Sequence, residues 1–89
     1  MIQSTISISN KLGLHARASA KLTKLAGRFK SEIHLGRNSR RVNAKSILGV
    51  MMLAAGQGSE ISIEVDGEDE ELAMQGLLEL IADRFGEGE

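Results

Sequence analysis

The 89-residue sequence contains no cysteine, proline, tyrosine or tryptophan, and its only Phe, Tyr or Trp residues are Phe29 and Phe85. The absence of cysteine excludes disulfides, thiolate nucleophiles and thiolate metal ligands. Because single-stranded nucleic acids are bound by stacking on aromatic side chains, this composition argues against a nucleic-acid partner. No apolar run reaches the roughly 20 residues that a membrane span requires. The first residues also lack the basic region followed by an apolar block that is typical of a secretion signal. We therefore expect a cytoplasmic protein without membrane insertion.

The remaining composition, 42% hydrophobic and 26% charged residues, is typical of a folded globular protein. Its length predicts one domain over residues 1–89. The net charge of -1 conceals a division, because residues 1–45 hold all but one of the Lys and Arg residues and residues 46–89 hold all but one of the acids. A compact fold should therefore carry a positive zone able to bind an anion or steer an acidic partner. Its expected members are Arg17, Lys21, Lys24, Arg28 and Lys45.

The hydrophobic pattern predicts the element order βαββαβα. Alternating segments indicate strands at 2–9, 31–36, 41–44 and 59–65. The segment RNSR forms the turn between the second and third strands, and Asp66-Gly67 forms the turn after the fourth. Helical spacing indicates helices at 16–27, 47–56 and from 68 through Phe85, with residues 86–89 frayed. Strands that alternate have one wet face, so we predict an α+β two-layer sandwich whose antiparallel sheet is covered on one face by three helices.

His15 stands at the entrance of the first predicted helix, within the segment GLHARASAKL at residues 13–22. The first backbone N–H groups of a helix lack intrahelical partners and lie at its positive end, which favours anions. A phosphate on the imidazole could contact the N–H groups of Ala16 and Arg17 and the Arg17 guanidinium. A histidine at such a position can also be a plain capping or surface residue, so the pattern alone leaves both interpretations open.

The segments GLHARASAKL and NAKSILGVMMLAAGQGSEI (43–61), together with the element order, closely resemble the HPr family, the histidine-containing phosphocarriers of the bacterial phosphoenolpyruvate-dependent sugar phosphotransferase system. The resemblance implies an open-faced sandwich with sheet order 1-4-2-3. It also implies that His15 accepts a phosphoryl group from phosphorylated Enzyme I on Nδ1 and passes it to an IIA domain, while Arg17 neutralises the phosphate. Such a protein is a carrier and not an enzyme, and it needs no cofactor. Many family members have proline where Ala18 stands, which leaves the rigidity of the first turn open.

Ser46 precedes the second predicted helix and is a good N-cap residue. The HPr resemblance implies a second role, regulatory phosphorylation by the ATP-dependent HPr kinase/phosphorylase. The helix after Ser46 is apolar nearly all round, so part of it should be exposed as a docking patch. From the resemblance, the residues expected to contact Enzyme I are Ile47, Leu48 and Met51, surrounded by Arg17, Lys24 and Lys45.

Three alternatives remain at the level of sequence: a nitrogen-branch or purely regulatory HPr relative, a small nucleic-acid-binding module, and a small phosphatase or hydrolase. The last is disfavoured because a deep pocket with paired acid and base residues is hard to build when the acids cluster on the fourth strand and the last helix. His34 alternates outward from Ile33 and Leu35, and we interpret it as a solvated strand residue and not a metal ligand. We expect a monomer.

Overall fold

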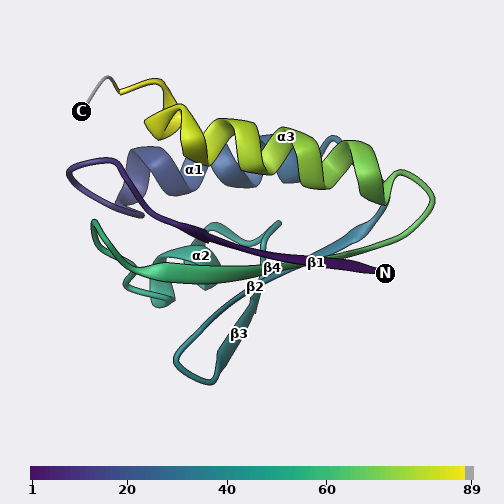
Figure 1. Ribbon diagram of the computed structural model, residues 1–89, viewed down its shortest axis with the longest axis horizontal. Coiled ribbons are helices and arrows are strands. Elements are labelled where there is room, and N and C mark those ends of the chain that lie inside the picture. Colours follow the sequence, from purple (N-terminus) through teal and green to yellow (C-terminus); the bar gives the residue numbers. More distant parts are fainter. Residues whose placement is uncertain (88–89) are drawn as a thin grey trace.

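The computed structural model describes residues 1–87 and shows a sheet with order β1-β4-β2-β3 in which every pair of neighbours is antiparallel (Figure 1). The strands are β1 (Ile2–Ser7), β2 (Glu32–Arg37), β3 (Arg40–Asn43) and β4 (Glu60–Asp66). The helices are α1 (Ala16–Ala26), α2 (Ile47–Met52) and α3 (Glu70–Ala82), followed by a 3-10 turn, η1 (Arg84–Gly86). The predicted α+β sandwich and its strand order are confirmed. Within residues 1–87 no helix is long and apolar enough to cross a membrane.

Alternation of side chains fixes the register of the sheet. In β4, Ile61, Ile63 and Val65 are buried while the residues between them are half-exposed. Ile6 of β1 lies opposite Ile61, and Leu35 of β2 lies opposite Ile63, so apolar side chains meet on one face. A slip of one residue would turn these side chains to solvent, which makes the observed register the stable one.

The two long helices cover the apolar face of the sheet. In Figure 1, α1 and α3 lie side by side across the sheet and run in opposite directions, while α2 packs against α1 and β3. Helix α1 buries Ala18, Leu22 and Ala26. Four members of the predicted positive zone are exposed: Arg17, Lys21 and Lys24 on α1, and Arg28 just after its end. The helix ends at Ala26, one residue before the predicted end, with Gly27 as its C-cap residue.

The hairpin between β2 and β3 supports the end of α2. Its central residues Asn38–Ser39 have φ values of 51° and 68°, which is the left-handed pair that a tight type I′ turn requires. On either side of the turn, the Arg37 guanidinium donates to the Leu53 carbonyl at 3.1 Å and the Arg40 guanidinium donates to the Met52 carbonyl at 2.7 Å. These carbonyls belong to the last residue of α2 and to the residue after it, where intrahelical donors are lacking, so the two arginines act as the C-terminal cap of the helix.

Helix α2 is shorter than the sequence pattern predicts. The expected helix extended over 47–56, with a glycine near its end, but α2 stops at Met52. Ala54 then adopts φ 51°, which breaks the helix without a glycine. The apolar run continues because Leu53 and Ala55 are buried in the core from the following loop, so hydrophobicity alone could not mark the end of the helix.

The C-terminal segment also departs from the prediction. The predicted helix ran through Phe85, but α3 ends at Ala82. Arg84 and Phe85 adopt left-handed backbone conformations, with φ values of 55° and 56°. Phe85 is nevertheless buried, with 1% of its surface exposed, and Lys21 Nζ donates to its carbonyl at 2.6 Å. The predicted fraying is therefore wrong for Gly86 and Glu87, which this anchor holds in place, whereas residues 88–89 lie outside the described part of the chain.

Replacing Phe85 by alanine is expected to lower the free energy of unfolding by about 3–5 kcal/mol, because it empties a fully buried aromatic site. Urea denaturation followed by circular dichroism measures this loss. Phe85→Leu is the control, since it keeps an apolar side chain and should lose much less. A change of under about 1 kcal/mol on Phe85→Ala would contradict the placement of this ring in the core.

Candidate functional site

His15 occupies the N-cap position of α1, with an extended backbone of φ -77° and ψ 179°. Its side chain makes no capping hydrogen bond, and 27% of that side chain is exposed. Its carbonyl accepts a hydrogen bond from the Ser19 N–H at 2.8 Å, which closes the first turn of the helix. The amides of Ala16 and Arg17 come directly after His15, at the positive end of the helix where no intrahelical carbonyl reaches them.

The residues before His15 are fixed by a close backbone approach. Gly13 has φ 65°, and a Cβ atom on it would lie 2.5 Å from the Ala55 carbonyl oxygen. The next residue, Leu14, is buried and donates its N–H to the same Ala55 carbonyl at 2.8 Å. Only glycine fits this position, because a side chain would collide with the Ala55 backbone and strain φ. The Gly-Leu pair therefore sets where His15 begins the helix.

Ser19 adds a second restraint that the sequence analysis did not find. It is fully buried, and its hydroxyl donates to the Leu14 carbonyl at 3.1 Å. Together with the bond from its own N–H to His15, it ties the first turn of α1 to the two residues before the helix. Ala18, which stands where many family members have proline, is also buried. The side chain of Ser19 thus provides a local restraint on a first turn that has no proline.

A carboxylate lies against the imidazole. His15 Nε2 and Glu87 Oε2 are 2.6 Å apart, and only 13% of the Glu87 side chain is exposed. The other carboxylate oxygen, Oε1, accepts from Asn10 Nδ2 at 3.0 Å, and the same Asn10 amide donates to the Gly13 carbonyl at 2.8 Å. Neither Asn10 nor Glu87 was predicted from the sequence to lie at this site. An acid in a glycine-rich C-terminal tail gives no periodic signal, so its position could be found only from the fold.

The surroundings of Glu87 keep it ionised. Burial by itself raises the pKa of Glu87, but hydrogen bonds from Asn10 and His15 and electrostatic interactions with His15 and Lys21 lower it by more, and the net pKa is below the usual value. The expected positive environment of His15 therefore needs a correction, because the imidazole has a carboxylate at one nitrogen as well as the helix N-terminus beside it.

The predicted anion-binding residues do come together. A shallow hollow, called here the His15 hollow, is lined by Lys11, Leu12, His15, Ala16, Arg17 and Glu87. Arg17 is exposed on the first turn of α1, where its guanidinium is available to an incoming anion. Leu12 was not singled out from the sequence, yet 67% of it is exposed. The hollow thus combines two cationic side chains, a half-exposed imidazole, a carboxylate and two apolar side chains.

The second predicted site is at the start of α2. Ser46 is exposed and caps the helix, since its hydroxyl oxygen accepts from the Gly49 N–H at 3.1 Å, so its predicted N-cap role is confirmed. Of the helix residues only Val50 is buried. The prediction that part of this helix is exposed is confirmed as well. The apolar surface of α2 consists of Ile47, Leu48, Met51 and Met52, with 40%, 72%, 39% and 59% of their areas exposed.

The predicted positive zone is divided between surface and structural roles. Arg17, Lys24 and Lys45 are exposed, as expected for a docking rim. Lys45 Nζ also donates to the Phe29 carbonyl at 2.8 Å, past the end of α1. Lys21 instead holds the C-terminal segment through the Phe85 carbonyl, so its ammonium group is used within the fold.

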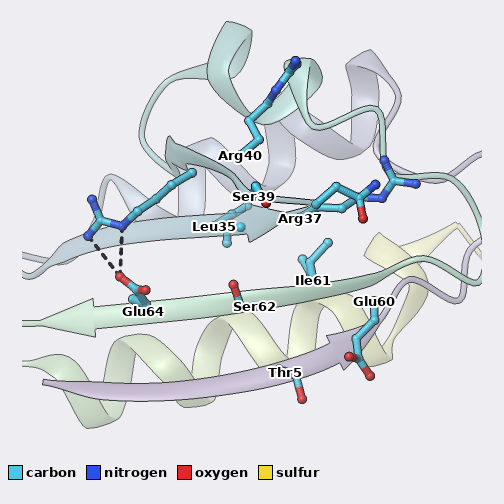
Figure 2. A pocket seen from close by; sticks show the side chains of 12 residues that line it. Thr5, Leu35, Arg37, Ser39, Arg40, Glu60, Ile61, Ser62 and Glu64 are labelled. Carbon is cyan, nitrogen blue, oxygen red and sulfur yellow. Dashed lines mark hydrogen bonds and ion pairs between the residues drawn. The ribbon is translucent and has the colours of Figure 1, made fainter.

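The open face of the sheet offers a different hollow, but the three arginines that line it already have hydrogen-bond acceptors. Figure 2 shows Ser62, Glu64 and Thr5 on this face, with Arg37 and Arg40 directed toward the end of α2. Arg41 pairs with Glu64 at 3.0 Å. Residues 1–87 include no cluster of three or more His, Asp or Glu residues able to hold a metal ion, and His34 is half-buried in β2, as predicted for a strand residue facing away from the core.

An open-faced sandwich that presents a half-exposed histidine at a helix entrance, next to an exposed apolar helix, has the architecture of a histidine phosphocarrier. The protein-family model described as "PTS HPr component phosphorylation site" matches residues 2–83. The phosphocarrier protein HPr of Cupriavidus necator is 65% identical and that of Neisseria meningitidis 56% identical, each over the full length of both chains. The crystal structure of HPr-C-His from Thermoanaerobacter tengcongensis has a TM-score of 0.95 at 44% identity, covering 98% of each chain. The chain belongs to the HPr family of phosphocarriers of the phosphotransferase system.

The lowered pKa of Glu87 generates a test of the site. Removing the ring in His15→Ala removes two of the influences that lower this pKa, so the Glu87 carboxyl should titrate at higher pH than in the wild type. The stability that the ionised carboxylate contributes is present above its unfolded pKa and is lost as pH falls through the lower folded pKa. The side-chain carboxyl ¹³C shift of Glu87, followed against pH, measures the change.

Asp69 is the internal control for this titration. Its pKa is lowered by hydrogen bonds from the Ser31 hydroxyl and from the Lys30 and Ser31 amides, far from His15 in the sequence and on the other end of α3. Its curve should be the same in the wild type and in His15→Ala. An unchanged Glu87 curve would contradict the contact between the carboxylate and the imidazole.

Proposed function

We propose that His15 is the residue that carries the phosphoryl group, which it accepts from phosphorylated Enzyme I and passes to an IIA domain. The observation that supports this most directly is the half-exposed imidazole at the start of α1, whose Nε2 is bonded to Glu87. In the forward step the Nδ1 lone pair attacks phosphorus, the donor's P–N bond breaks, and the phosphoryl group moves to His15. The second transfer reverses these roles, with His15 Nδ1 as the leaving nitrogen.

The residues around Nδ1 favour the added charge. A phosphoryl group on His15 would lie near the unpartnered N–H groups of Ala16 and Arg17, and the dipole of α1 stabilises an anion there. The Arg17 guanidinium adds charge-assisted hydrogen bonds from within the same hollow. Phosphoryl transfer depends mainly on positioning and charge stabilisation, which this chain supplies in part and the partner enzymes complete. The phosphate derives from phosphoenolpyruvate through Enzyme I, so the carrier requires no cofactor.

The partner surface is the exposed part of α2 with its basic rim. Ile47, Leu48 and Met51 supply apolar area on a helix that buries only Val50. Flexible methionine side chains suit a surface that must fit Enzyme I and IIA in turn. The exposed Arg17, Lys24 and Lys45 would steer acidic partners to it. We expect the protein to act as a cytoplasmic monomer.

Ser46 is the proposed regulatory site, phosphorylated by HPr kinase/phosphorylase. Its hydroxyl is exposed at the start of α2, beside the proposed docking residues. A phosphate at a helix N-terminus is compatible with the helix, so the modification should act through charge on the docking surface and not by unfolding. A negative charge there would repel acidic partners of His15.

Incubation with phosphoenolpyruvate and Enzyme I is expected to add one acid-labile phosphate to the wild type and none to His15→Ala. Intact mass detects the addition, and ³¹P NMR identifies the ring nitrogen. Arg17→Ala should still be labelled but roughly ten- to a hundredfold more slowly, because a positioned charge is lost. Lys11→Ala, which removes a cation from the same hollow, is the matched control and should be affected less. Full labelling of His15→Ala would disprove the proposed acceptor.

With HPr kinase/phosphorylase and ATP, an acid-stable phosphate is expected on Ser46 and absent from Ser46→Ala. The phosphorylated protein should then accept phosphate from Enzyme I more slowly, while its circular dichroism spectrum stays unchanged. Ser46→Ala by itself should cost about 1 kcal/mol of stability through loss of the N-cap. Labelling of Ser59 or another serine, seen by peptide mass mapping, would refute this assignment.

A further inference from the structure

We propose that Glu87 is a positioning residue for His15: its carboxylate holds the imidazole in the tautomer that carries the proton on Nε2 and presents an unprotonated Nδ1 to the phosphoryl donor. This inference rests on the proposed function of His15 and deepens it. The contact that carries it is the 2.6 Å separation between His15 Nε2 and Glu87 Oε2. An ionised carboxylate can only accept, so a neutral ring in this contact must place its proton on Nε2.

Both oxygens of the Glu87 carboxylate are fixed. Oε2 contacts His15, and Oε1 accepts from Asn10, whose side chain is fully buried and also bonded to the Gly13 carbonyl. A continuous chain of hydrogen bonds therefore runs from the Gly13 carbonyl through Asn10 and Glu87 to the His15 imidazole. Such a chain limits rotation of the carboxylate and hence of the ring, which is the role that outer partners play for reactive histidines elsewhere.

The fold places Glu87 at His15 by a specific path. After α3 ends at Ala82, the left-handed residues Arg84 and Phe85 take the chain off the helical path, and the buried Phe85 ring anchors the 3-10 turn that follows. Lys21, on α1, fixes the Phe85 carbonyl and adds a positive charge near Glu87. Arg84 and Phe85 both adopt a backbone conformation that is unfavourable for residues other than glycine. The path that this conformation gives the chain places the Glu87 carboxylate against the imidazole.

The carboxylate also suits the phosphorylated state. When the Nδ1 lone pair forms the bond to phosphorus and the donor's P–N bond breaks, the proton stays on Nε2 and the ring becomes cationic. Glu87 then faces a positive ring, while the phosphoryl group faces the start of α1 and Arg17. No proton has to leave the ring for the transfer, and the return of the phosphoryl group to an acceptor restores the neutral Nε2–H form.

The test compares the wild type, Glu87→Ala and the charge-matched control Glu71→Ala, which removes an exposed acid from the first turn of α3. Two-bond ¹H–¹⁵N spectra at about pH 9, where an imidazole is ordinarily uncharged, report the tautomer of His15 without any phosphorylation. The wild type and Glu71→Ala should show Nε2–H, and Glu87→Ala should show a several-fold larger Nδ1–H fraction. Initial rates of phosphoryl acceptance from Enzyme I should fall roughly tenfold in Glu87→Ala alone.

The two readouts separate the two proposals. If the wild type accepts phosphate and Glu87→Ala keeps both its tautomer and its rate, the positioning role is wrong. A shifted tautomer with an unchanged rate would overturn it too, because the ring would then need no positioning for the transfer. If the wild type is not phosphorylated at His15, the proposed function fails, and the tautomer spectra still decide whether Glu87 holds the ring.

Discussion

The arrangement of the site depends on one close approach, that of the Gly13 backbone to the Ala55 carbonyl. A Cβ atom on Gly13 would lie only 2.5 Å from the Ala55 carbonyl oxygen. Only glycine therefore allows the loop before α1 to pack on the loop after α2. Leu14 reinforces the contact by donating to the same carbonyl. Because one loop leads into His15 and the other follows the exposed helix, this contact joins the proposed phosphoryl acceptor and the proposed docking surface into one unit.

Each end of α2 is held by a different kind of interaction. Ser46 caps the first turn through Gly49, while Arg37 and Arg40 of the β2–β3 hairpin satisfy carbonyls at the other end. A six-residue helix is too short to be stable by itself. These caps hold in place a helix that buries only Val50 and leaves its other large apolar side chains exposed, and that exposure is what a partner surface requires.

Much of the fold could be predicted from residue patterns, and the failures have a common cause. The alternation of Ile61, Ile63 and Val65 and the spacing of Leu22 and Ala26 identified β4 and α1, because each pattern reports burial on one face. The end of α3 was missed because Phe85 lies four residues after Ile81 and continues the helical spacing. The predicted burial of Phe85 was therefore right and its predicted helical conformation was wrong, because the pattern records which side chains are buried and not the backbone path that buries them.

The same limit explains why half of the candidate site was found. His15, Ala16 and Arg17 are consecutive, so the local rule for helix entrances was enough to group them. Asn10 and Glu87 are 77 positions apart and meet only through the path that the chain takes after α3. The opposite charge of the two halves of the sequence predicted a positive zone, but it located no ion pair.

The contact at Nε2 makes the sign of the charge differ on the two sides of the imidazole: a carboxylate lies at Nε2, and amides and a guanidinium lie at the start of α1. In the proposed function, a ring that accepts and releases a phosphoryl group benefits from both, because the carboxylate stabilises the charged ring and the amides and guanidinium stabilise the phosphate. Neither encloses the phosphoryl group, so the hollow stays accessible to two different partners.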